Sequence, residues 1–260
     1  MIRSLDTVAH QFNLLQKKQE NLSTNIANVN TSGYKYQELV QSTTETFQFG
    51  NNLNGPMLNQ QNPIDGLNFG NQIDTAYRNL SQGGLKGRNS NNDFALMGDA
   101  FFTVQMPNGG QAVTRNGNFA VDATGNLITQ EGYLVLGRNQ AGQIATIPAG
   151  SVPFTVDQTG NVNATGVRFL LTDNVEAENL QSIGDTLFSY QAGMTTDDDT
   201  LVLQKYLETS NVDMTDHMVQ MMQLTREFEA NQKILHASDE TLSKAVNEIG
   251  KVYEEGVRQR

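Results

Sequence analysis

The side chains of this chain best suited to catalysis or metal binding are three histidines and one acidic triplet. His217 and His236 lie nineteen residues apart on one expected helix, which separates them by about 28 Å along its axis, too far to share a metal ion. We expect these two residues and His10 to lie on helix surfaces. The triplet 197–199 lacks the alternating Asp/Asn ligands and the glycine of an EF-hand loop, so we interpret it as a solvated loop.

Two segments share the pattern Asp-x-Thr-Gly-Asn, at 122–126 and 157–161. They can be read as ligand sets, but the same residues form hairpin turns without a metal, because Asp caps the turn and Gly takes a positive φ. The sequence has no HExxH, GxSxG or Walker-type motif, and it has no cysteine, which excludes disulfides, thiolate zinc sites and cysteine nucleophiles. We therefore predict no catalytic residue, no cofactor and no metal site, and we expect the protein not to be an enzyme.

The composition indicates a turn-rich β protein with an acidic surface. Of the 260 residues, 37% are hydrophobic and only 17% are charged, and the formal net charge is −11. The mean hydropathy of −0.45 therefore comes from Asn, Gln, Ser, Thr and Gly. No basic cluster is present, which argues against a nucleic-acid partner. No stretch approaches the roughly 20 apolar residues that span a bilayer, and the N-terminus lacks the apolar run of a conventional secretory signal.

The N-terminal segment carries apolar residues at alternating steps of three and four. This spacing is typical of a helix that buries one narrow stripe against another helix. We expect a helix from residue 3 to about 31, with Gly33 at the left-handed C′ position. Its stripe consists of Leu5, Val8, Phe12, Leu15, Leu22, Ile26 and Val29.

The same spacing returns at the C-terminal end. We expect this helix to start at a loose capping box of Ser210 and Asp213, or with Asn211 as N-cap, and to end near residue 253. Its stripe consists of Met214, Met218, Met221, Phe228, Leu235, Leu242, Val246 and Ile249. Three polar residues fall on the expected seam, namely Thr225, Gln232 and Asp239.

Neither stripe has a partner nearby in sequence, so we predict that the two helices pair as a coiled coil, within one chain or between copies. The alternative is an ordinary helical layer packed on the β region. A helix of about 40 residues is about 60 Å long and would overhang a β domain of this size, which favours assembly.

Between the helices, short strand-like runs are separated by turns about every ten residues, which is typical of a sandwich or an open barrel of short antiparallel strands. We therefore predict a mainly β central domain inserted between N- and C-terminal helices. The residues rich in Asn, Gln and Gly at 48–72 read as a long loop or an extended arm. The predicted parts are an N-terminal helix at 1–33, an Asn/Gln-rich arm at 34–75, a β-rich outer domain at 76–205 and a C-terminal helix at 206–260.

The segments at the two ends resemble those of the bacterial flagellar rod and hook proteins. Residues 23–35 (STNIANVNTSGYK) resemble the family's N-terminal signature NN-(L/I)-A-N-x-x-T-x-G-(F/Y)-K, with Thr24 in place of the first Asn. Residues 207–214, followed by the Met-rich helix, are similar to the C-terminal rod signature. The signature positions at the two ends are Asn25, Ala27, Asn28, Thr31, Gly33, Lys35, Asn211 and Val212.

Two further motifs of the same family occur in the middle of the chain. Residues 96–102 resemble L-x-G-x-G-F-F, with Ala100 in place of the second Gly, and residues 114–119 match T-R-(D/N)-G-x-F. The signature positions here are Gly98, Phe101, Phe102, Arg115 and Gly117. The resemblance covers nearly the whole chain, and length favours a rod protein of the distal type over a longer hook protein.

The resemblance implies a structural function. The terminal helices would pair as a coiled coil in the inner tube of a hollow helical shaft that transmits torque from motor to hook, and the β region would lie outside. The implied partners are other copies of the chain, other rod and hook subunits and the flagellar type III export machinery. The protein would lie in the flagellar basal body, outside the cytoplasmic membrane, exported without a cleaved signal peptide and without membrane insertion.

Three other interpretations remain open at this point. A proximal rod or hook-type axial subunit would follow the same assembly logic. A secreted β-rich adhesin would need an exposed aromatic or charged cluster, and the chain has no tryptophan and only 7% aromatic residues. A cell-wall hydrolase would need a carboxylate pair or a metal site in a cleft.

Overall fold

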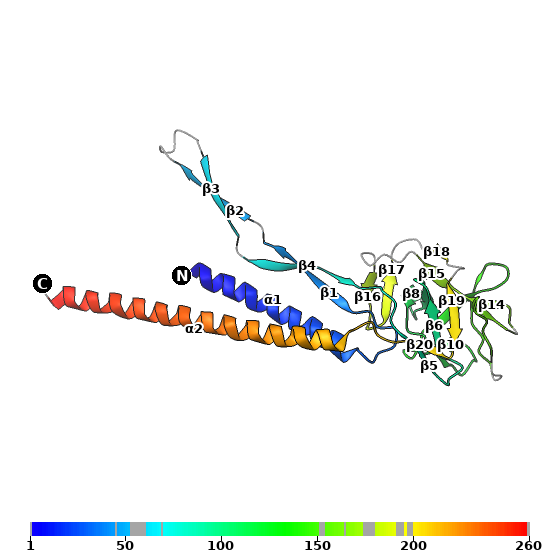
Figure 1. Ribbon diagram of the computed structural model, residues 1–260. Coiled ribbons are helices and arrows are strands. Elements are labelled where there is room, and N and C mark those ends of the chain that lie inside the picture. Colours follow the sequence, from blue (N-terminus) through cyan, green and yellow to red (C-terminus); the bar gives the residue numbers. More distant parts are fainter. Residues whose placement is uncertain are drawn as a thin grey trace. The chain divides into compact units, whose positions relative to one another are not determined.

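The computed structural model has a helix at each end of the chain and an antiparallel β-rich region between them (Figure 1). Helix α1 is Ile2–Ala27 and helix α2 is Met214–Arg258. This order confirms the predicted arrangement of helix, β region and helix. The structure describes residues 2–44, 46–52, 61–68, 70–150, 154–163, 165–173, 180–190, 195–196 and 200–258, so the acidic triplet 197–199 lies outside the described residues.

The chain divides into two compact units. The helical unit contains Met1–Ser23, Leu39–Ala76 and Met218–Arg260, and the β unit contains Thr24–Glu38 and Tyr77–His217. The last turn of α1 and the first turn of α2 therefore belong to the β unit.

Helix α1 ends earlier than the sequence predicts. It stops at Ala27 rather than near residue 31, because the Val29 N–H bonds to the Ile26 carbonyl (3.3 Å), three residues back, and the helical hydrogen-bond pattern ends there; the Asn28 side chain adds a hydrogen bond to the Thr24 carbonyl (3.1 Å). Gly33 has the expected positive φ of 69°, but it lies in the turn that follows and not at the C′ position.

Helix α2 begins directly after Asp213, which is its N-cap. The Asp213 Oδ1 atom accepts hydrogen bonds from the backbone N–H groups of Thr215 (2.9 Å) and Asp216 (3.3 Å). The predicted alternative of Asn211 as N-cap is wrong because the Asn211 side chain bonds to other segments. Ser210 instead accepts a hydrogen bond from a backbone N–H before the helix starts.

The described residues between 37 and 78 contain two strand pairs. β1 (Gln37–Thr43) pairs with β4 (Asn71–Arg78), and β2 (Thr46–Asn52) pairs with β3 (Gln61–Asn68) (Figure 1). The sequence predicts a long loop or an extended arm over 48–72; the described residues of this segment are mostly paired strands, so the long-loop alternative is wrong and the extended arm stays a prediction. Asn- and Gln-rich segments are prone to β pairing, and here they satisfy their backbone groups by pairing with each other.

Most of β1–β4 belongs to the helical unit, and the strands that follow in the β unit are short. They are β5 (Leu85–Gly87), β6 (Phe94–Met97), β7 (Phe101–Gln105), β8 (Gln111–Thr114), β9 (Ala120–Val121), β10 (Leu127–Ile128), β11 (Leu134–Arg138), β12 (Ile144–Thr146), β13 (Asn161–Val162), β14 (Val167–Phe169), β15 (Leu171–Asp173), β16 (Leu180–Ser182), β17 (Leu187–Tyr190), β18 (Thr195–Thr196), β19 (Leu201–Gln204) and β20 (Tyr206–Glu208).

The largest sheet follows the order β13-β14-β11-β7-β8-β17-β16. β10 and β12 also pair with β11, β9 with β10, β15 with β7, and β18 with β15. Two separate pairs are β19–β6 and β20–β5, and the registers of these strands are antiparallel. Because β7 and β11 each pair with more than two strands, the sheet branches, and the described residues form no closed barrel.

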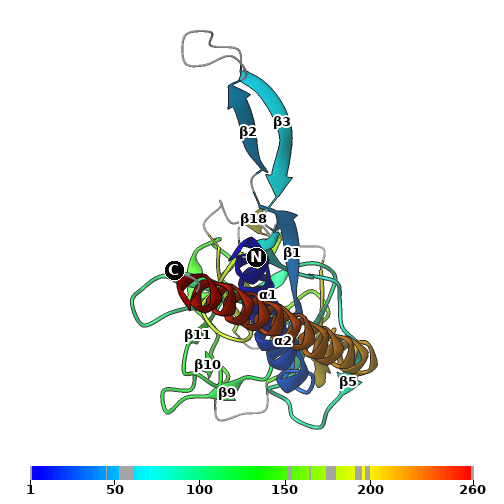
Figure 2. The same cartoon turned by 90° about the vertical axis from the view of Figure 1, so that its left-hand side faces the viewer.

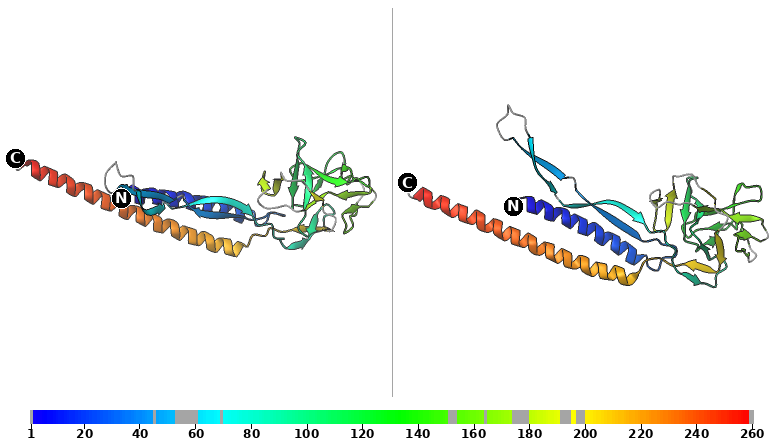
Figure 3. Two further views of the ribbon diagram at one scale, coloured as in Figure 1. Left: turned by 90° about the horizontal axis from the view of Figure 1, so that it is seen from above. Right: turned by 45° about the horizontal axis from the view of Figure 1, so that its top comes forward.

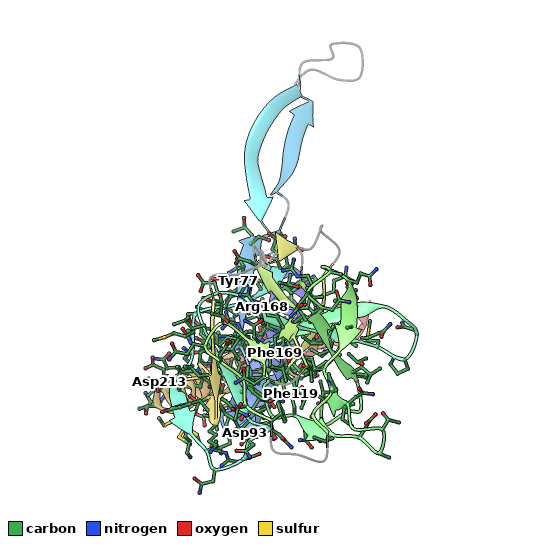
Figure 4. All side chains as sticks on the ribbon, turned by 90° about the vertical axis from the view of Figure 1, so that its right-hand side faces the viewer. Tyr77, Asp93, Phe119, Arg168, Phe169 and Asp213 are labelled. Atoms are coloured by element: carbon green, nitrogen blue, oxygen red, sulfur yellow. The ribbon has the colours of Figure 1, made fainter. Side chains whose placement is uncertain are left out.

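The core of the β unit is centred on Phe94, Phe102, Phe119 and Phe169. The ring centroids of Phe94 and Phe169 lie 5.1 Å apart, and those of Phe102 and Phe119 lie 5.2 Å apart. Figure 4 places Phe119 and Phe169 toward the middle of the β unit. Phe101 points to a second buried cluster on the opposite face of β7, so both faces of this strand are covered.

The two Asp-x-Thr-Gly-Asn segments form the predicted turns with the same hydrogen bonds. Asp122 Oδ1 accepts from the backbone N–H groups of Thr124 (2.9 Å) and Asn126 (2.8 Å), and Asp157 Oδ1 accepts from the corresponding groups in its turn. Hydrogen bonds from the hydroxyl groups of Thr124 and Thr159, the largest cause, hold the pKa of each aspartate below its ordinary value.

Candidate functional site

Helices α1 and α2 lie side by side and antiparallel within the helical unit (Figures 2 and 3). The rings of the two phenylalanines at the contact have centroids 5.8 Å apart. Apolar packing of this kind removes the contacting side chains from water, which is the main source of helix–helix attraction. We call this contact the seam cluster, and it consists of Phe12, Leu15, Leu22, Met221, Leu224 and Phe228.

The contact face of α2 is rotated by one residue from the face predicted from sequence. Leu224 is buried, whereas the neighbouring Thr225 is exposed. Asn231 and Ser238 continue the half-buried line seven and fourteen residues later. The polar residues expected on the seam, Thr225, Gln232 and Asp239, are all exposed. The seam keeps the predicted spacing and avoids these polar side chains.

The other predicted interface residues differ in their exposure. Half-buried side chains on or just after the helices are those of Val8, Ile26, Val29 and Leu242. Exposed ones are those of Met214, Met218, Leu235 and Val246. Leu5 and Ile249 lie on the helices, but their side chains lie outside the described residues. Contacts of the exposed residues with other copies stay a prediction.

Two buried leucines of the helices were missed by the sequence reasoning. Leu224 is 5% exposed and Leu14 is 4% exposed. A signal for Leu224 was available, since it lies three residues after Met221 and four before Phe228. Leu14 lies beside Leu15 and off the predicted stripe, so the spacing gave no reason to choose it.

The family signature positions, by contrast, gather in the β unit, and Asn25 is the centre of their hydrogen bonds. Its Oδ1 accepts from the Tyr34 hydroxyl (2.9 Å) and the Gln37 N–H (3.0 Å). Its Nδ2 donates to the Gln37 carbonyl (2.9 Å) and lies 3.3 Å from His217 Nε2. Asn25 is 1% exposed, so this amide uses its full bonding capacity away from water.

His217 corrects the expectation that the three histidines lie on helix surfaces. It is buried, and its Nδ1 lies 2.9 Å from the Asp213 carbonyl, while His10 and His236 are exposed as predicted. The tautomer with the proton on Nδ1 donates to Asp213 and accepts from Asn25 at Nε2. The first turn of α2 is thereby attached to the last turn of α1.

Three charged side chains form a buried ion triad beside this network. Lys35 Nζ lies 2.6 Å from Glu208 Oε1, and Arg115 Nη1 lies 3.3 Å from Glu208 Oε2. All three side chains are at most 1% exposed. Glu208 Oε1 also accepts the Gly83 N–H (2.9 Å), and Lys35 Nζ also donates to the Ser81 carbonyl (2.7 Å). The triad joins the segment after α1, a turn of the β unit and the strand before α2.

Desolvation dominates the electrostatics of the triad. Burial lowers the pKa of Lys35, and attraction to Glu208 opposes that shift without cancelling it. Burial likewise lowers the pKa of Arg115 against the opposing effect of Glu208. Arg115 is further held by a hydrogen bond from Nη2 to the Gly98 carbonyl (2.6 Å) and by stacking over Phe101, 4.8 Å from the ring centroid. Two cations therefore share Glu208 as their paired carboxylate, and Asp99 adds a weaker attraction to both.

Two signature glycines allow close backbone approaches. Gly33 donates its N–H to the Glu208 carbonyl (2.8 Å), and a Cβ there would overlap the backbone of Arg115. Gly117 accepts the Phe94 N–H (3.0 Å), and a Cβ there would overlap the Phe94 carbonyl. A side chain at either position would push apart segments that the ion triad and the core hold together.

Asn211 fastens the segment before α2. Its Oδ1 accepts from the Tyr36 N–H (2.9 Å), and its Nδ2 donates to the carbonyls of Asn79 (2.9 Å) and Ser81 (3.1 Å).

The remaining signature residues are the buried Phe101, Phe102 and Val212, the exposed Ala27, and Asn28 and Thr31, which bond to each other in the turn after α1. We call Asn25, Gly33, Tyr34, Lys35, Arg115, Glu208, Asn211 and His217 the junction cluster.

In the sequence, Tyr34 and Glu208 occur only within the quoted signature motifs, and His217 was expected on a helix surface, so none of the three was predicted as a member of a buried cluster. Among the described residues, no group of three or more His, Asp or Glu side chains is placed to hold a metal ion. None of the described helices is long and apolar enough to cross a membrane.

Three family profiles match the chain, and together they cover just over half of it. "Flagella basal body rod protein" matches residues 12–35, "Flagellar hook protein FlgE/F/G D1 domain" matches 95–164, and "Flagellar basal body rod FlgEFG protein C-terminal" matches 203–248. The ion triad takes one residue from each matched segment.

Curated relatives match over most of their length. The chain is 30% identical over 269 residues to the flagellar basal-body rod protein FlgG of Bacillus subtilis, covering 95% of this chain and 99% of the relative. It is 31% identical over 252 residues to FlgG of Buchnera aphidicola subsp. Schizaphis graminum, covering 86% and 90%. It is also 28% identical over 247 residues to the flagellar basal-body rod protein FlgF of Rhizobium meliloti, covering 91% and 93%.

Proposed function

The chain belongs to the family of flagellar basal-body rod proteins and is a structural subunit of the distal rod, and we propose that its terminal helices pair as a coiled coil in the inner tube of a hollow, torque-transmitting shaft. The seam cluster is the observation that carries this proposal. It pairs α1 with α2 through side chains spaced by three and four residues.

Apolar surface left on α2 supports further contacts with other subunits. Met218, Met222, Ile234 and Val246 are 47%, 57%, 53% and 67% exposed. The 45 residues of α2 also exceed the 26 of α1, so one copy of α1 does not cover the whole length of α2. Copies of the chain, and other rod and hook subunits, would cover this surface in the polymer.

Assembly would also order the terminal helices. Among the described side chains, three buried leucines anchor the seam, and long helices gain most of their stability from tertiary packing rather than from propensity. We infer that the helices are poorly ordered in the free subunit and become ordered as the stripe is buried. This delays polymerisation in the cytosol and suits export as an unfolded chain through the flagellar type III machinery.

The β2–β3 hairpin is proposed to bridge neighbouring subunits. Among the described strands, β2 and β3 pair only with each other. An isolated two-stranded hairpin is marginally stable in water, so this hairpin needs a further contact. The β unit would lie on the outside of the shaft.

The experiment is incorporation of point variants into rods. Leu22→Asp, Met221→Asp and Leu224→Asp place a charge on the seam and should abolish incorporation while the β unit stays folded. The matched control is Thr225→Asp, which adds the same charge to the same helix at an exposed position and should still assemble. Normal rods from the three seam variants would show that the helix pairing is not the assembly contact.

A further inference from the structure

We infer that the junction cluster is a preformed nucleus for both terminal helices, which holds one turn of each helix in place before the subunit assembles. The inference rests on the proposed function only for the assembly step, because the nucleus itself is a property of the free subunit. Its basis is that residues 24–27 of α1 and 214–217 of α2 belong to the β unit, whereas the rest of each helix does not.

The last turn of α1 is fixed by Asn25. Four hydrogen-bonding contacts connect this one side chain to Tyr34, Gln37 and His217, so the turn is attached both to the chain that follows it and to α2. Tyr34 is itself fully buried, with the Arg78 guanidinium 5.2 Å from its ring centroid. A helical turn held in this way does not depend on the seam cluster.

The first turn of α2 is fixed from both sides. On one side, Asp213 caps the free N–H groups of the turn. On the other side, His217 Nε2 is hydrogen-bonded to Asn25 Nδ2, and the ring centroids of His217 and Tyr36 lie 5.8 Å apart. Just before the turn, Asn211 bonds to the segments at Tyr36, Asn79 and Ser81. The start of α2 thus has defined position and direction.

The ion triad anchors both turns to the β unit. Lys35 follows the first turn, Glu208 precedes the second, and Arg115 belongs to the β unit between them. Gly33 adds a direct backbone bond to Glu208. Because all of these residues lie in the β unit, their contacts belong to its fold and not to the pairing of the helices.

Starting a helix is the unfavourable step in helix formation, with a nucleation factor of about 10⁻³. A preformed turn at the inner end of each helix removes most of this factor, so residues 2–23 and 218–258 only have to propagate outward. We therefore expect helix growth during docking to begin at the junction cluster and to reach the chain termini last.

The test is amide hydrogen exchange, measured by mass spectrometry on the full-length monomer. Residues 24–37 and 211–217 should be protected as strongly as β7 and β8, while protection should fall steeply toward the chain ends in 2–20 and 225–258. Equally fast exchange in both turns and in the outer helices would overturn the inference. This readout needs no polymer, so it can fail or succeed independently of the rod assembly test.

Two variants make the assignment specific. Asn25→Ala should raise exchange in both turns by about tenfold or more, since it breaks several buried hydrogen bonds, while β7 and β8 stay protected. Tyr34→Phe removes one of these bonds with little change in packing and should give a smaller rise in the same peptides. Ser23→Ala, an exposed neighbour on α1, is the control and should change nothing. Unchanged exchange in 213–217 of both variants would refute the coupling of the two turns.

Discussion

Removing the carboxylate of the ion triad should lower the free energy of unfolding far more than removing one of its cations. At an effective dielectric constant of about 20, Coulomb's law gives gross attractions of about 6 kcal/mol for the 2.6 Å pair of Lys35 with Glu208 and about 5 kcal/mol for the 3.3 Å pair of Arg115 with Glu208. Desolvation of the three buried groups offsets most of this. Glu208→Gln leaves two buried cations without their paired carboxylate and with only weaker attraction from carboxylates such as Asp99, so we expect the free energy of unfolding to fall by about 3–5 kcal/mol.

Lys35→Met is the informative comparison. It leaves Glu208 paired with Arg115 and with the Gly83 N–H, and it removes a cation whose burial is unfavourable. The remaining loss is one of the two hydrogen bonds that the Ser81 carbonyl accepts, since Asn211 Nδ2 still donates to it, and we expect the free energy of unfolding to fall by about 0.5–1.5 kcal/mol. Glu208→Gln should therefore be the more destabilising of the two changes.

The assay is urea unfolding followed by tyrosine fluorescence, because the chain has seven tyrosines and no tryptophan. Glu240→Gln is the control, since Glu240 pairs with Lys244 at 2.8 Å but both side chains are about 70% exposed, and we expect a change of at most about 0.5 kcal/mol. A loss below about 1 kcal/mol for Glu208→Gln, or a larger loss for Lys35→Met, would refute the reasoning about uncompensated buried charge.

Three further predictions follow from single contacts. Gly33→Ala should lower the free energy of unfolding in urea by at least about 2 kcal/mol, because the new Cβ combines a positive φ with overlap of the neighbouring backbone. Gly109→Ala also has a positive φ but meets open space, so it should lower this free energy by only about 1 kcal/mol. Equal losses for the two variants would contradict the overlap. Asp213→Ala should cost about 1 kcal/mol through loss of the N-cap and reduce the helix signal in circular dichroism, and an unchanged signal would remove its capping role. Asp122 and Asp157 have folded-state pKa values below the ordinary 3.8, so the stabilisation they provide is present above that pH and is lost as the pH falls through the folded-state values. Replacing both residues with Asn should therefore make the melting temperature fall less steeply in acid. An unaltered dependence of the melting temperature on acid pH would exclude this contribution.

The helices and the β class could be predicted because each depends on local pattern. Steps of three and four gave both helices, and Asp with Thr-Gly gave the turns at 122–126 and 157–161. The exact contact face of α2 was harder to predict from the sequence. Met221 and Phe228 belong to both possible faces, and only tertiary contact with α1 selects Leu224 over Thr225.

The junction cluster could not be assembled from sequence spacing. Lys35 and Glu208 are 173 positions apart, and Asn25 and His217 are 192 positions apart. No periodic pattern connects such residues, because pairing of this kind is decided by the topology of the β unit. The resemblance identified most of these positions as signature residues, but it gave no physical reason for them. That reason is their mutual burial at the two inner helix ends.

The most direct test of the central claim is a disulfide cross-link inside assembled rods. The chain has no cysteine, so the pair Phe12→Cys and Phe228→Cys reports without background on the two rings that meet at the seam. We predict that rods oxidised after assembly release the subunit at single-chain mass with the cross-link within one chain. A ladder of covalent oligomers would instead show that the helices pair between different copies and contradict the intrachain seam.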